Sequence, residues 1–169
     1  NAVASTIVDK MKLLNDPRID IYIKKITING AGFQGQYRGN ITGEDTDDSG
    51  ENLFSRVGSA YASTDSPVVL MSAAEVNFIK AEIYFRSNDM VKSKISFDTA
   101  ITQDFSALGL SGKVSVYLAD SKVAFNNSLE RIMEQKWITM FQSAFESWVD
   151  WRRTGFPVFT KIPSFNMTG

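Results

Sequence analysis

The stretch SAAEVNFIKAEIYFR, residues 72–86, is apolar over most of its circumference when it is written as a helix. A helix of this kind must be buried between neighbouring elements. The next stretch, residues 89–103, also predicts a helix, because its apolar residues recur at helical spacing. No Gly or Pro interrupts either stretch. Together the two stretches predict a helical hairpin in a mainly α protein.

Small and aromatic side chains in this hairpin fit the spacing of a tetratricopeptide-type repeat. With Ala81 at the small position of the first helix, the small, aromatic and small positions of the second are Ser93, Phe97 and Ala100. Small side chains let two antiparallel helices approach closely, and the aromatic ring fills the space beside them. The match departs at the opening Trp and closing Pro positions, which here are Asn77 and Phe105. A generic helical hairpin would explain the same residues.

A third and longer helix is predicted from Ser128 to Trp151, because apolar residues recur there at steps of three and four. Asn127 or Ser128 can cap its start. Two tryptophans, Trp137 and Trp148, lie at core spacing, and we expect both in the hydrophobic core.

Charged residues and helix breakers mark the end of this third helix. Arg152 and Arg153 lie near the negative end of the helix dipole, and Asp150 can pair with one of them. Gly155 and Pro157 end the helix.

The first third of the chain is less regular. Residues 2–14 predict a short amphipathic helix, residues 19–28 an extended segment, and residues 29–66 a long polar loop. We therefore divide the chain into residues 1–66, a short helix with an extended and Gly-rich loop region, and residues 67–169, the helical region. Both parts are expected to belong to one fold that is truncated at both ends.

The composition excludes several kinds of chemistry. The 169 residues include no His and no Cys, which removes disulfides, thiolate and imidazole metal ligands, Cys nucleophiles and Ser-His-Asp triads. The formal net charge of -1 does not suit a protein that coats nucleic acid. We expect no cofactor and no nucleic-acid partner.

Aromatic and polar residues in the Gly-rich loop are the candidates for ligand contact. Phe33, Tyr37 and Arg38 lie there together, beside two Gln residues. A flat ring matches the apolar face of a pyranose, and amides, carboxylates and Arg bind its hydroxyl groups. The same aromatic residues could instead anchor the loop to the body of the protein.

Acidic residues in the same loop raise the question of a metal ion. Asp45, Asp47 and Asp48 could supply oxygen ligands for Ca²⁺. The EF-hand template fails, because its twelfth position requires a bidentate Glu and this chain has Arg56. An irregular oxygen-ligand site and a solvated acidic loop remain as alternatives.

Pairs of carboxylates on the predicted helices raise an enzymatic alternative. Glycoside hydrolysis needs two carboxyl groups and no His or Cys. Glu75 with Glu82 and Glu130 with Glu134 are the pairs available. Ordinary helix-surface ion pairs explain these residues equally well.

The run from Glu146 to Pro157, ESWVDWRRTGFP, strongly resembles the pattern near the C-terminus of the SusD/RagB family of glycan-binding outer-membrane lipoproteins. Within it, Trp148, Asp150, Trp151, Arg152, Arg153 and Gly155 match as fold determinants. The other matching stretches follow in the expected order: Leu14-Asn15-Asp16-Pro17-Arg18, Ser72-Ala73-Ala74-Glu75-Val76 with Ala81-Glu82, Tyr117-Leu118-Ala119, and Glu130-Arg131-Ile132 with Gln135-Lys136-Trp137.

This resemblance implies a SusD-like α-helical fold with tetratricopeptide-like hairpins and long irregular loops. It also implies a binding protein rather than an enzyme, one that captures oligosaccharides and passes them to a SusC-like TonB-dependent transporter. Such proteins are held on the cell surface at the outer membrane of Bacteroidetes by a lipid anchor, which here would lie outside this chain. Members of the family are longer than this chain. A helical-repeat scaffold for a partner protein and a two-carboxylate glycosidase are the alternatives.

Overall fold

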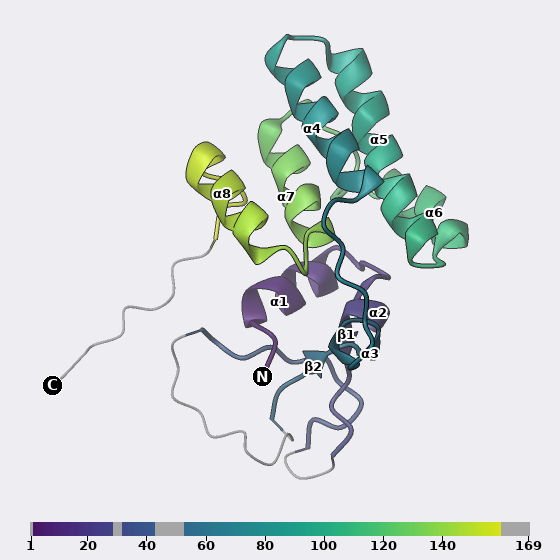
Figure 1. The fold of residues 1–169 in the computed structure, drawn as a ribbon, viewed down its shortest axis with the longest axis vertical. Helices are drawn as coiled ribbons and strands as arrows, with labels where there is room; N and C mark the ends of the chain where they lie inside the picture. The colour runs from purple at the N-terminus through teal and green to yellow at the C-terminus, as the bar shows by residue number, and fades with distance from the viewer. Residues whose placement is uncertain (1, 29–31, 43–52, 160–169) are drawn as a thin grey trace, which may run out of the picture. The chain divides into compact units, whose positions relative to one another are not determined.

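The computed structural model describes residues 2–28, 32–42 and 53–159 (Figure 1). The described residues are mainly helical, which confirms the predicted fold class. The chain divides into two compact units, one of residues 1–66 with 159–169 and the other of residues 67–158.

Two helices form the predicted hairpin in the unit of residues 67–158 (Figure 1). They are α4 (Ala73–Arg86) and α5 (Met90–Ala107). The side chain of Ser72 accepts a hydrogen bond from a backbone N–H in the first turn of α4, and that of Asp89 does the same for α5. These caps satisfy N–H groups that have no partner inside the helix, so both helices begin where the sequence has a capping residue.

The contact between α4 and α5 has the predicted pattern of small and aromatic side chains. Ala81, Ser93, Phe97 and Ala100 are completely buried. The Ser93 hydroxyl donates a hydrogen bond to the Ala81 carbonyl at 2.8 Å, which requires the two backbones to lie close together. The Phe97 ring packs edge-on against Phe78, with their centroids 6.0 Å apart. The spacing of small residues therefore predicted this interface correctly.

The prediction of one long helix from Ser128 to Trp151 is wrong. Two helices occupy this region, α7 (Leu129–Thr139) and α8 (Ala144–Thr154). On a single straight helix, Lys136 and Asp150 would lie about 21 Å apart along the axis. Instead, Lys136 Nζ and Asp150 Oδ2 are 2.6 Å apart, because the chain turns back between the helices.

The ends of these two helices agree with the sequence. Ser128 caps α7 by accepting a hydrogen bond from the Arg131 N–H at 3.2 Å. Gly155 follows α8 with a φ of 76°, in the left-handed region that suits glycine. Before α7, a 3₁₀ turn (Ser111–Lys113) leads into α6 (Val114–Ala119), where the Tyr117 ring contacts Phe105. Phe105, which stands at the motif's Pro position, is fully buried.

Burial differs sharply between α7 and α8. Helix α7 buries Ile132, Met133 and Ile138, whereas α8 buries none of its residues. The expected core position of Trp148 is wrong, since 55% of this residue is exposed. Trp137, on α7, is partly buried. Apolar residues recur at helical spacing through the break between the two helices. This spacing therefore predicted that α8 lies in the core together with α7.

In the other unit, the predicted first helix is present as α1 (Ser5–Leu13), which buries Ile7, Val8 and Met11. Residues 19–28 are not extended throughout, as the sequence had suggested, because α2 (Ile19–Tyr22) precedes the short strand β1 (Ile23–Lys24). Strand β1 pairs antiparallel with β2 (Arg56–Val57), and α3 (Ser59–Ala62) follows. The end of the predicted long loop therefore contains regular structure.

A buried ion pair lies directly before α2. Arg18 Nη2 is 2.5 Å from Asp16 Oδ2, and Arg18 Nε donates to Asp16 Oδ1 at 2.9 Å. Neither side chain is exposed to solvent. The backbone N–H of Arg18 also donates to Asp16 Oδ1, at 3.0 Å, so the carboxylate fixes the backbone turn around Pro17. The chain enters α2 from this turn, with the Tyr22 N–H bonded to the Arg18 carbonyl.

Candidate functional site

A groove of about 500 Å³ lies in the unit of residues 1–66 and contains one of the predicted ligand residues. We call it the Tyr37 groove. Its volume is typical of sites for small molecules. Acidic, basic, hydroxyl and apolar groups line it: Asp20, Ile21, Ile23, Lys24, Lys25, Thr27, Tyr37, Gly58, Ser59 and Ala60.

Close backbone packing shapes one wall of the Tyr37 groove. The N–H of Gly58 donates to the Tyr22 carbonyl at 2.7 Å, which joins the start of α3 to the end of α2. A Cβ atom at position 58 would lie 1.9 Å from the Ile21 carbonyl oxygen. Only glycine permits this approach, so the residue type at position 58 determines how closely the segments on either side of the groove can lie.

The Tyr37 side chain is held by charged neighbours. Its hydroxyl donates a hydrogen bond to Asp20 Oδ1 at 2.5 Å, and Lys25 Nζ lies 5.3 Å from its ring centroid. Burial, and then the hydrogen bond to Asp20, raise the pKa of Tyr37 above its ordinary value of 10.0. The phenol therefore remains a neutral donor at physiological pH, with its ring fixed beside a carboxylate and an ammonium group.

Phe33 and Arg38 lie together but do not line the Tyr37 groove. The Arg38 guanidinium carbon is 4.2 Å from the Phe33 ring centroid and 4.9 Å from that of Phe54. Arg38 Nη1 also donates to the Leu53 carbonyl at 3.2 Å. These contacts connect the segment that carries Tyr37 to residues that precede β2. The structure therefore groups Phe33 with Arg38, and Tyr37 with Asp20.

The predicted oxygen-ligand site for a metal ion belongs to the acidic part of the Gly-rich loop. Asp45, Asp47 and Asp48 lie outside the described residues. Within the described ranges, no group of three or more Asp and Glu side chains is arranged to hold a metal ion.

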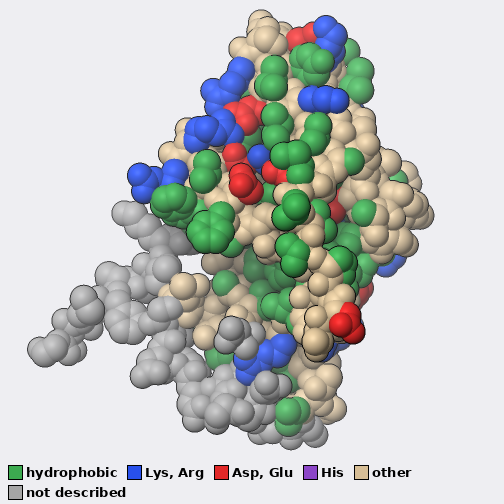
Figure 2. Space-filling model, viewed as in Figure 1, with side chains coloured by type: hydrophobic (Ala, Val, Ile, Leu, Met, Phe, Trp, Pro, Cys, Tyr) green, Lys and Arg blue, Asp and Glu red, His purple; other side chains and the backbone are tan. Residues whose placement is uncertain are grey.

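A second cavity, of about 490 Å³, lies in the unit of residues 67–158 between α4, α7 and α8. We call it the ionic cleft. Figure 2 shows acidic and basic side chains gathered on this face with hydrophobic side chains around them. Its lining consists of apolar residues from α4 and the segment before it, and charged residues from three helices: Leu70, Met71, Glu75, Ile79, Glu82, Ile83, Arg86, Lys136, Glu146, Asp150 and Arg153.

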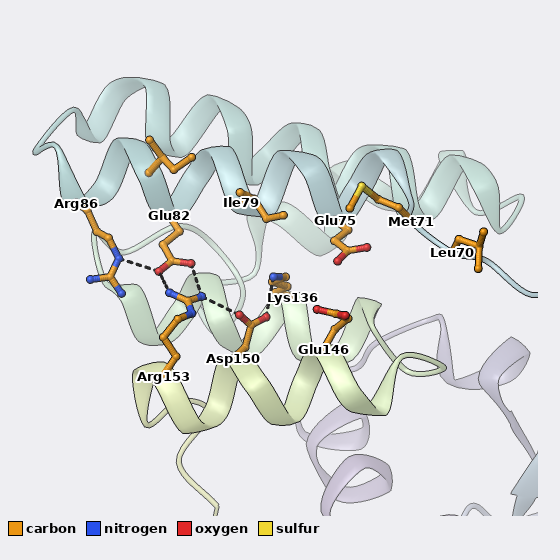
Figure 3. A pocket seen from close by; sticks show the side chains of 11 residues that line it. Leu70, Met71, Glu75, Ile79, Glu82, Arg86, Lys136, Glu146, Asp150 and Arg153 are labelled. Atoms are coloured by element: carbon orange, nitrogen blue, oxygen red, sulfur yellow. Dashed lines mark hydrogen bonds and ion pairs between the residues drawn. The ribbon is translucent and has the colours of Figure 1, made fainter.

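A chain of ion pairs crosses the ionic cleft (Figure 3). Glu82 on α4 accepts hydrogen bonds from both terminal nitrogens of Arg153 on α8, and from Arg86 Nε at 2.7 Å. Arg153 Nη2 also bonds to Asp150 Oδ1 at 2.7 Å, and Asp150 in turn pairs with Lys136 of α7. The motif residues Asp150 and Arg153 thus link α8 to two other helices.

The electrostatics of this network do not suit acid catalysis. Burial raises the pKa of Glu82, but the hydrogen bonds from Arg153 and Arg86 outweigh it and hold the pKa below the ordinary value of 4.5. A general acid in a glycosidase needs a raised pKa. In the second carboxylate pair, Glu130 with Glu134, the Glu134 Oε2 atom lies 3.7 Å from Arg131 Nη1. Glu82 and Glu134 therefore each form ion pairs with arginine side chains.

The remaining residues of the C-terminal motif lie on the surface of α8. Arg152 places its guanidinium carbon 5.1 Å from the Trp148 ring centroid. Trp151 is 40% exposed. Sequence reasoning missed Asp20 and Lys25 beside Tyr37, because 17 residues separate Tyr37 from Asp20 and no spacing rule connects them.

Within the described part of the chain, no helix has both the length and the hydrophobicity needed to cross a membrane. No curated protein matches the sequence.

Several solved structures resemble this one. A SusD homologue from Bacteroides thetaiotaomicron is 28% identical with a TM-score of 0.79, over 95% of this chain and 39% of that protein. A chitin-binding protein is 20% identical with a TM-score of 0.78, over 98% of this chain and 40% of that protein. A SusD homologue from Parabacteroides distasonis is 24% identical with a TM-score of 0.69, over 84% of this chain and 31% of that protein. The last two likenesses show the fold alone.

The matches cover most of this chain but less than half of each of the other proteins. The chain is covered almost completely by the first two, yet it spans only about two fifths of their length. A SusD-like family, described as "Starch-binding associating with outer membrane", matches residues 1–168. Because this match covers nearly every residue and the structural likeness agrees with it, the chain belongs to the SusD-like family.

Proposed function

We propose that the protein binds oligosaccharides and that the Tyr37 groove contacts the sugar. A pyranose has an apolar face that stacks on aromatic rings, and hydroxyl groups that bond to carboxylates and amines. The groove offers these groups together, as the Tyr37 ring, the Asp20 carboxylate and the ammonium groups of Lys24 and Lys25. The Tyr37 ring fixed beside Asp20 is the observation that carries the proposal. A family described as starch-binding supports it.

Phe33 and Arg38 have a supporting role in this proposal. The Arg38 guanidinium stacks on Phe33 and bonds to the backbone at Leu53. Tyr37 directly precedes Arg38 in the sequence, so these contacts also hold the segment on which Tyr37 lies. A sugar bound in the groove would therefore meet a ring whose position is already fixed, which lowers the entropy cost of binding.

The family resemblance extends the proposal to the whole protein. We infer that it delivers its ligand, chemically unchanged, to a SusC-like TonB-dependent transporter. It would do so at the cell surface, held to the outer membrane by a lipid anchor outside this chain. The family's described association with the outer membrane supports this location. The lowered pKa of Glu82 argues against its acting as the general acid of a glycosidase, since it keeps that carboxyl ionised.

Calorimetric titration with maltooligosaccharides and chitooligosaccharides tests the sugar site. We expect Tyr37→Ala to weaken binding about tenfold or more, since it removes the stacking surface. Tyr37→Phe should weaken binding less, because it keeps the ring. No Trp residue lines the groove, so calorimetry is preferable to Trp fluorescence.

Tyr84 provides a matched control for this experiment. It also carries a lysine near its ring, with Lys92 Nζ 5.6 Å from the centroid, but it lies on α4 and outside the Tyr37 groove. Tyr84→Ala should leave oligosaccharide affinity unchanged. Equal losses in the two variants, or no binding of either sugar series by the unaltered protein, would refute the assignment.

Purification of the protein from solubilised outer membranes tests the proposed partner. We expect a TonB-dependent transporter to be recovered with it. Recovery of soluble proteins alone would instead favour a helical scaffold.

A further inference from the structure

The charged groups that line the Tyr37 groove do not balance. One carboxylate, that of Asp20, and two ammonium groups, those of Lys24 and Lys25, line it, so the lining carries one positive charge in excess. Asp20 already accepts the hydrogen bond of the Tyr37 hydroxyl. Within the described residues, neither lysine has an ion pair, with Asp20 or with any other carboxylate.

The cations of the ionic cleft are arranged differently. Lys136 pairs with Asp150, and Arg153 pairs with both Glu82 and Asp150 (Figure 3). Those charges neutralise one another and connect helices. The two lysines of the Tyr37 groove are instead exposed side chains, one at the end of the two-residue strand β1 and the other directly after it. They are therefore available to a ligand in the groove.

The Tyr37 ring has charged groups of both signs around it. Asp20 Oδ1 accepts the hydrogen bond of its hydroxyl at 2.5 Å, and Lys25 Nζ lies 5.3 Å from its centroid. A sugar ring packed on Tyr37 would therefore lie close to an ammonium group. An anionic substituent of that sugar would gain a counter-charge there, whereas a neutral sugar would leave the excess positive charge of the groove unmatched.

We propose that the Tyr37 groove prefers acidic oligosaccharides, whose pyranose rings carry a carboxylate or a sulfate group. This inference rests on the proposed function, because it assigns a charge to the sugar bound in the same groove. The sugar ring would pack on Tyr37, and its anionic group would pair with the ammonium groups of Lys24 and Lys25. Charge-assisted hydrogen bonds are stronger than neutral ones, and a groove with an excess of one charge attracts ligands of the opposite charge.

Calorimetric titration of the full chain tests this preference. The probes are tetragalacturonate beside its methyl ester, and a sulfated galactose tetrasaccharide beside its desulfated form, so that each acid has a neutral counterpart with the same rings and linkages. We expect an acid to bind about tenfold more tightly than its counterpart at low ionic strength, which corresponds to about 1.4 kcal/mol. Which acid shows the larger gain identifies the anionic group.

The salt concentration provides a second readout. The Debye length falls from about 30 Å at about 0.01 M salt to about 8 Å at about 0.15 M, and exposed charges are screened accordingly. The gain of the acidic sugar over its neutral counterpart should therefore shrink as salt is added, while the affinity of the neutral sugar stays constant. A gain that does not respond to salt would overturn the proposal.

Substitution of the lysines tests whether their ammonium groups set the preference. A variant with both Lys24→Gln and Lys25→Gln should bind the acidic sugar no more tightly than the neutral one. Its affinity for the neutral sugar should match that of the unaltered chain, which checks that Tyr37 keeps its place although Lys25 contacts its ring. The matched control, Lys80→Gln with Lys113→Gln, removes the same charge from exposed residues outside the groove and should keep the preference.

The outcomes separate this inference from the proposed function. Equal binding of acidic and neutral sugars by the unaltered chain would overturn the charge preference and leave oligosaccharide binding in place. An undiminished preference in the double lysine variant would also overturn it, as would an equal loss of acidic and neutral sugars in that variant. No binding of any sugar, acidic or neutral, would refute the proposed function itself.

Discussion

Helix α8 is held by ion pairs rather than by burial, and this makes Arg153 a sharp test of the structure. None of the residues of α8 is buried. Arg153 joins the helix to Glu82 on α4 through both terminal nitrogens, and to Asp150 on α8 itself. The change Arg153→Met keeps a flexible, unbranched side chain and removes the guanidinium group with its charge. We expect it to loosen α8 from α4 while the α4–α5 hairpin stays folded.

The expected magnitude follows from the exposure of the two partners. Hydrogen bonds to charged groups contribute about 1.5–3 kcal/mol each, and breaking a buried ion pair costs about 3–5 kcal/mol. Here the Glu82 side chain is 8% exposed and keeps Arg86 as a partner, whereas the Arg153 side chain is 42% exposed and screened by water. We therefore expect a loss of about 2 kcal/mol, which corresponds to about thirtyfold faster local opening of α8.

Amide hydrogen exchange measures this opening directly. The α8 amides should exchange faster in Arg153→Met, while those of the α4–α5 interface change little. Arg152→Met is the matched control, because Arg152 is adjacent and stacks on the exposed Trp148 ring. That stacking should contribute less than about 1 kcal/mol. Equal exchange rates of α8 in the two variants would refute the claim that the ion pairs hold this helix.

The effect of Arg153→Met on stability should also depend on pH. The pKa of Glu82 lies below its ordinary value of 4.5 in the folded protein, since the two arginines outweigh the effect of burial. A group with a lowered pKa stabilises the fold above the unfolded pKa, and this stabilisation is lost as the pH falls through the folded pKa. The difference in stability between the unaltered chain and Arg153→Met should therefore narrow in acid. A difference that is constant from neutral to acidic pH would contradict this reasoning.

Three further predictions concern single side chains, each measured by urea denaturation. Asp16→Asn should destabilise the fold by about 3–5 kcal/mol, because it leaves the fully buried Arg18 without its paired charge; an unchanged midpoint would show that the pair contributes nothing. Gly58→Ala should cost at least about 1–3 kcal/mol, because its Cβ would overlap the Ile21 carbonyl oxygen, and an alanine variant of full stability would contradict the packing described. Trp148→Ala should cost less than about 1 kcal/mol, since the side chain is largely exposed, whereas a loss of several kcal/mol would return this residue to the core.

The local elements of the fold could be predicted from the sequence. The α4–α5 hairpin follows from the capping residues, from the absence of Gly and Pro within the helices, and from small residues at the contact. The left-handed Gly155 ends α8 where the sequence indicates. The family also followed from the sequence, because its motifs are spread along the chain in a fixed order. These features depend on residues close together in the chain, so a linear pattern contains them.

The candidate sites could be predicted only in part. Tyr37 was identified from its residue type and its loop, but its partner Asp20 was not, because the pairing depends on how the loop returns to α2 and β1. Glu75 was recognised as a motif residue. Its place in the lining of the ionic cleft is visible only once α7 and α8 lie opposite α4.

The sequence by itself determined where most helices form and which family the chain belongs to. The tertiary structure alone decided that the predicted long helix divides into α7 and α8. Apolar residues keep their helical spacing through the break, so the sequence pattern does not indicate that the chain changes direction there. The tertiary structure alone also decided that Glu82 pairs with Arg153, 71 residues away. Helical periodicity arises from neighbouring residues, whereas an ion pair between helices depends on how those helices pack in space.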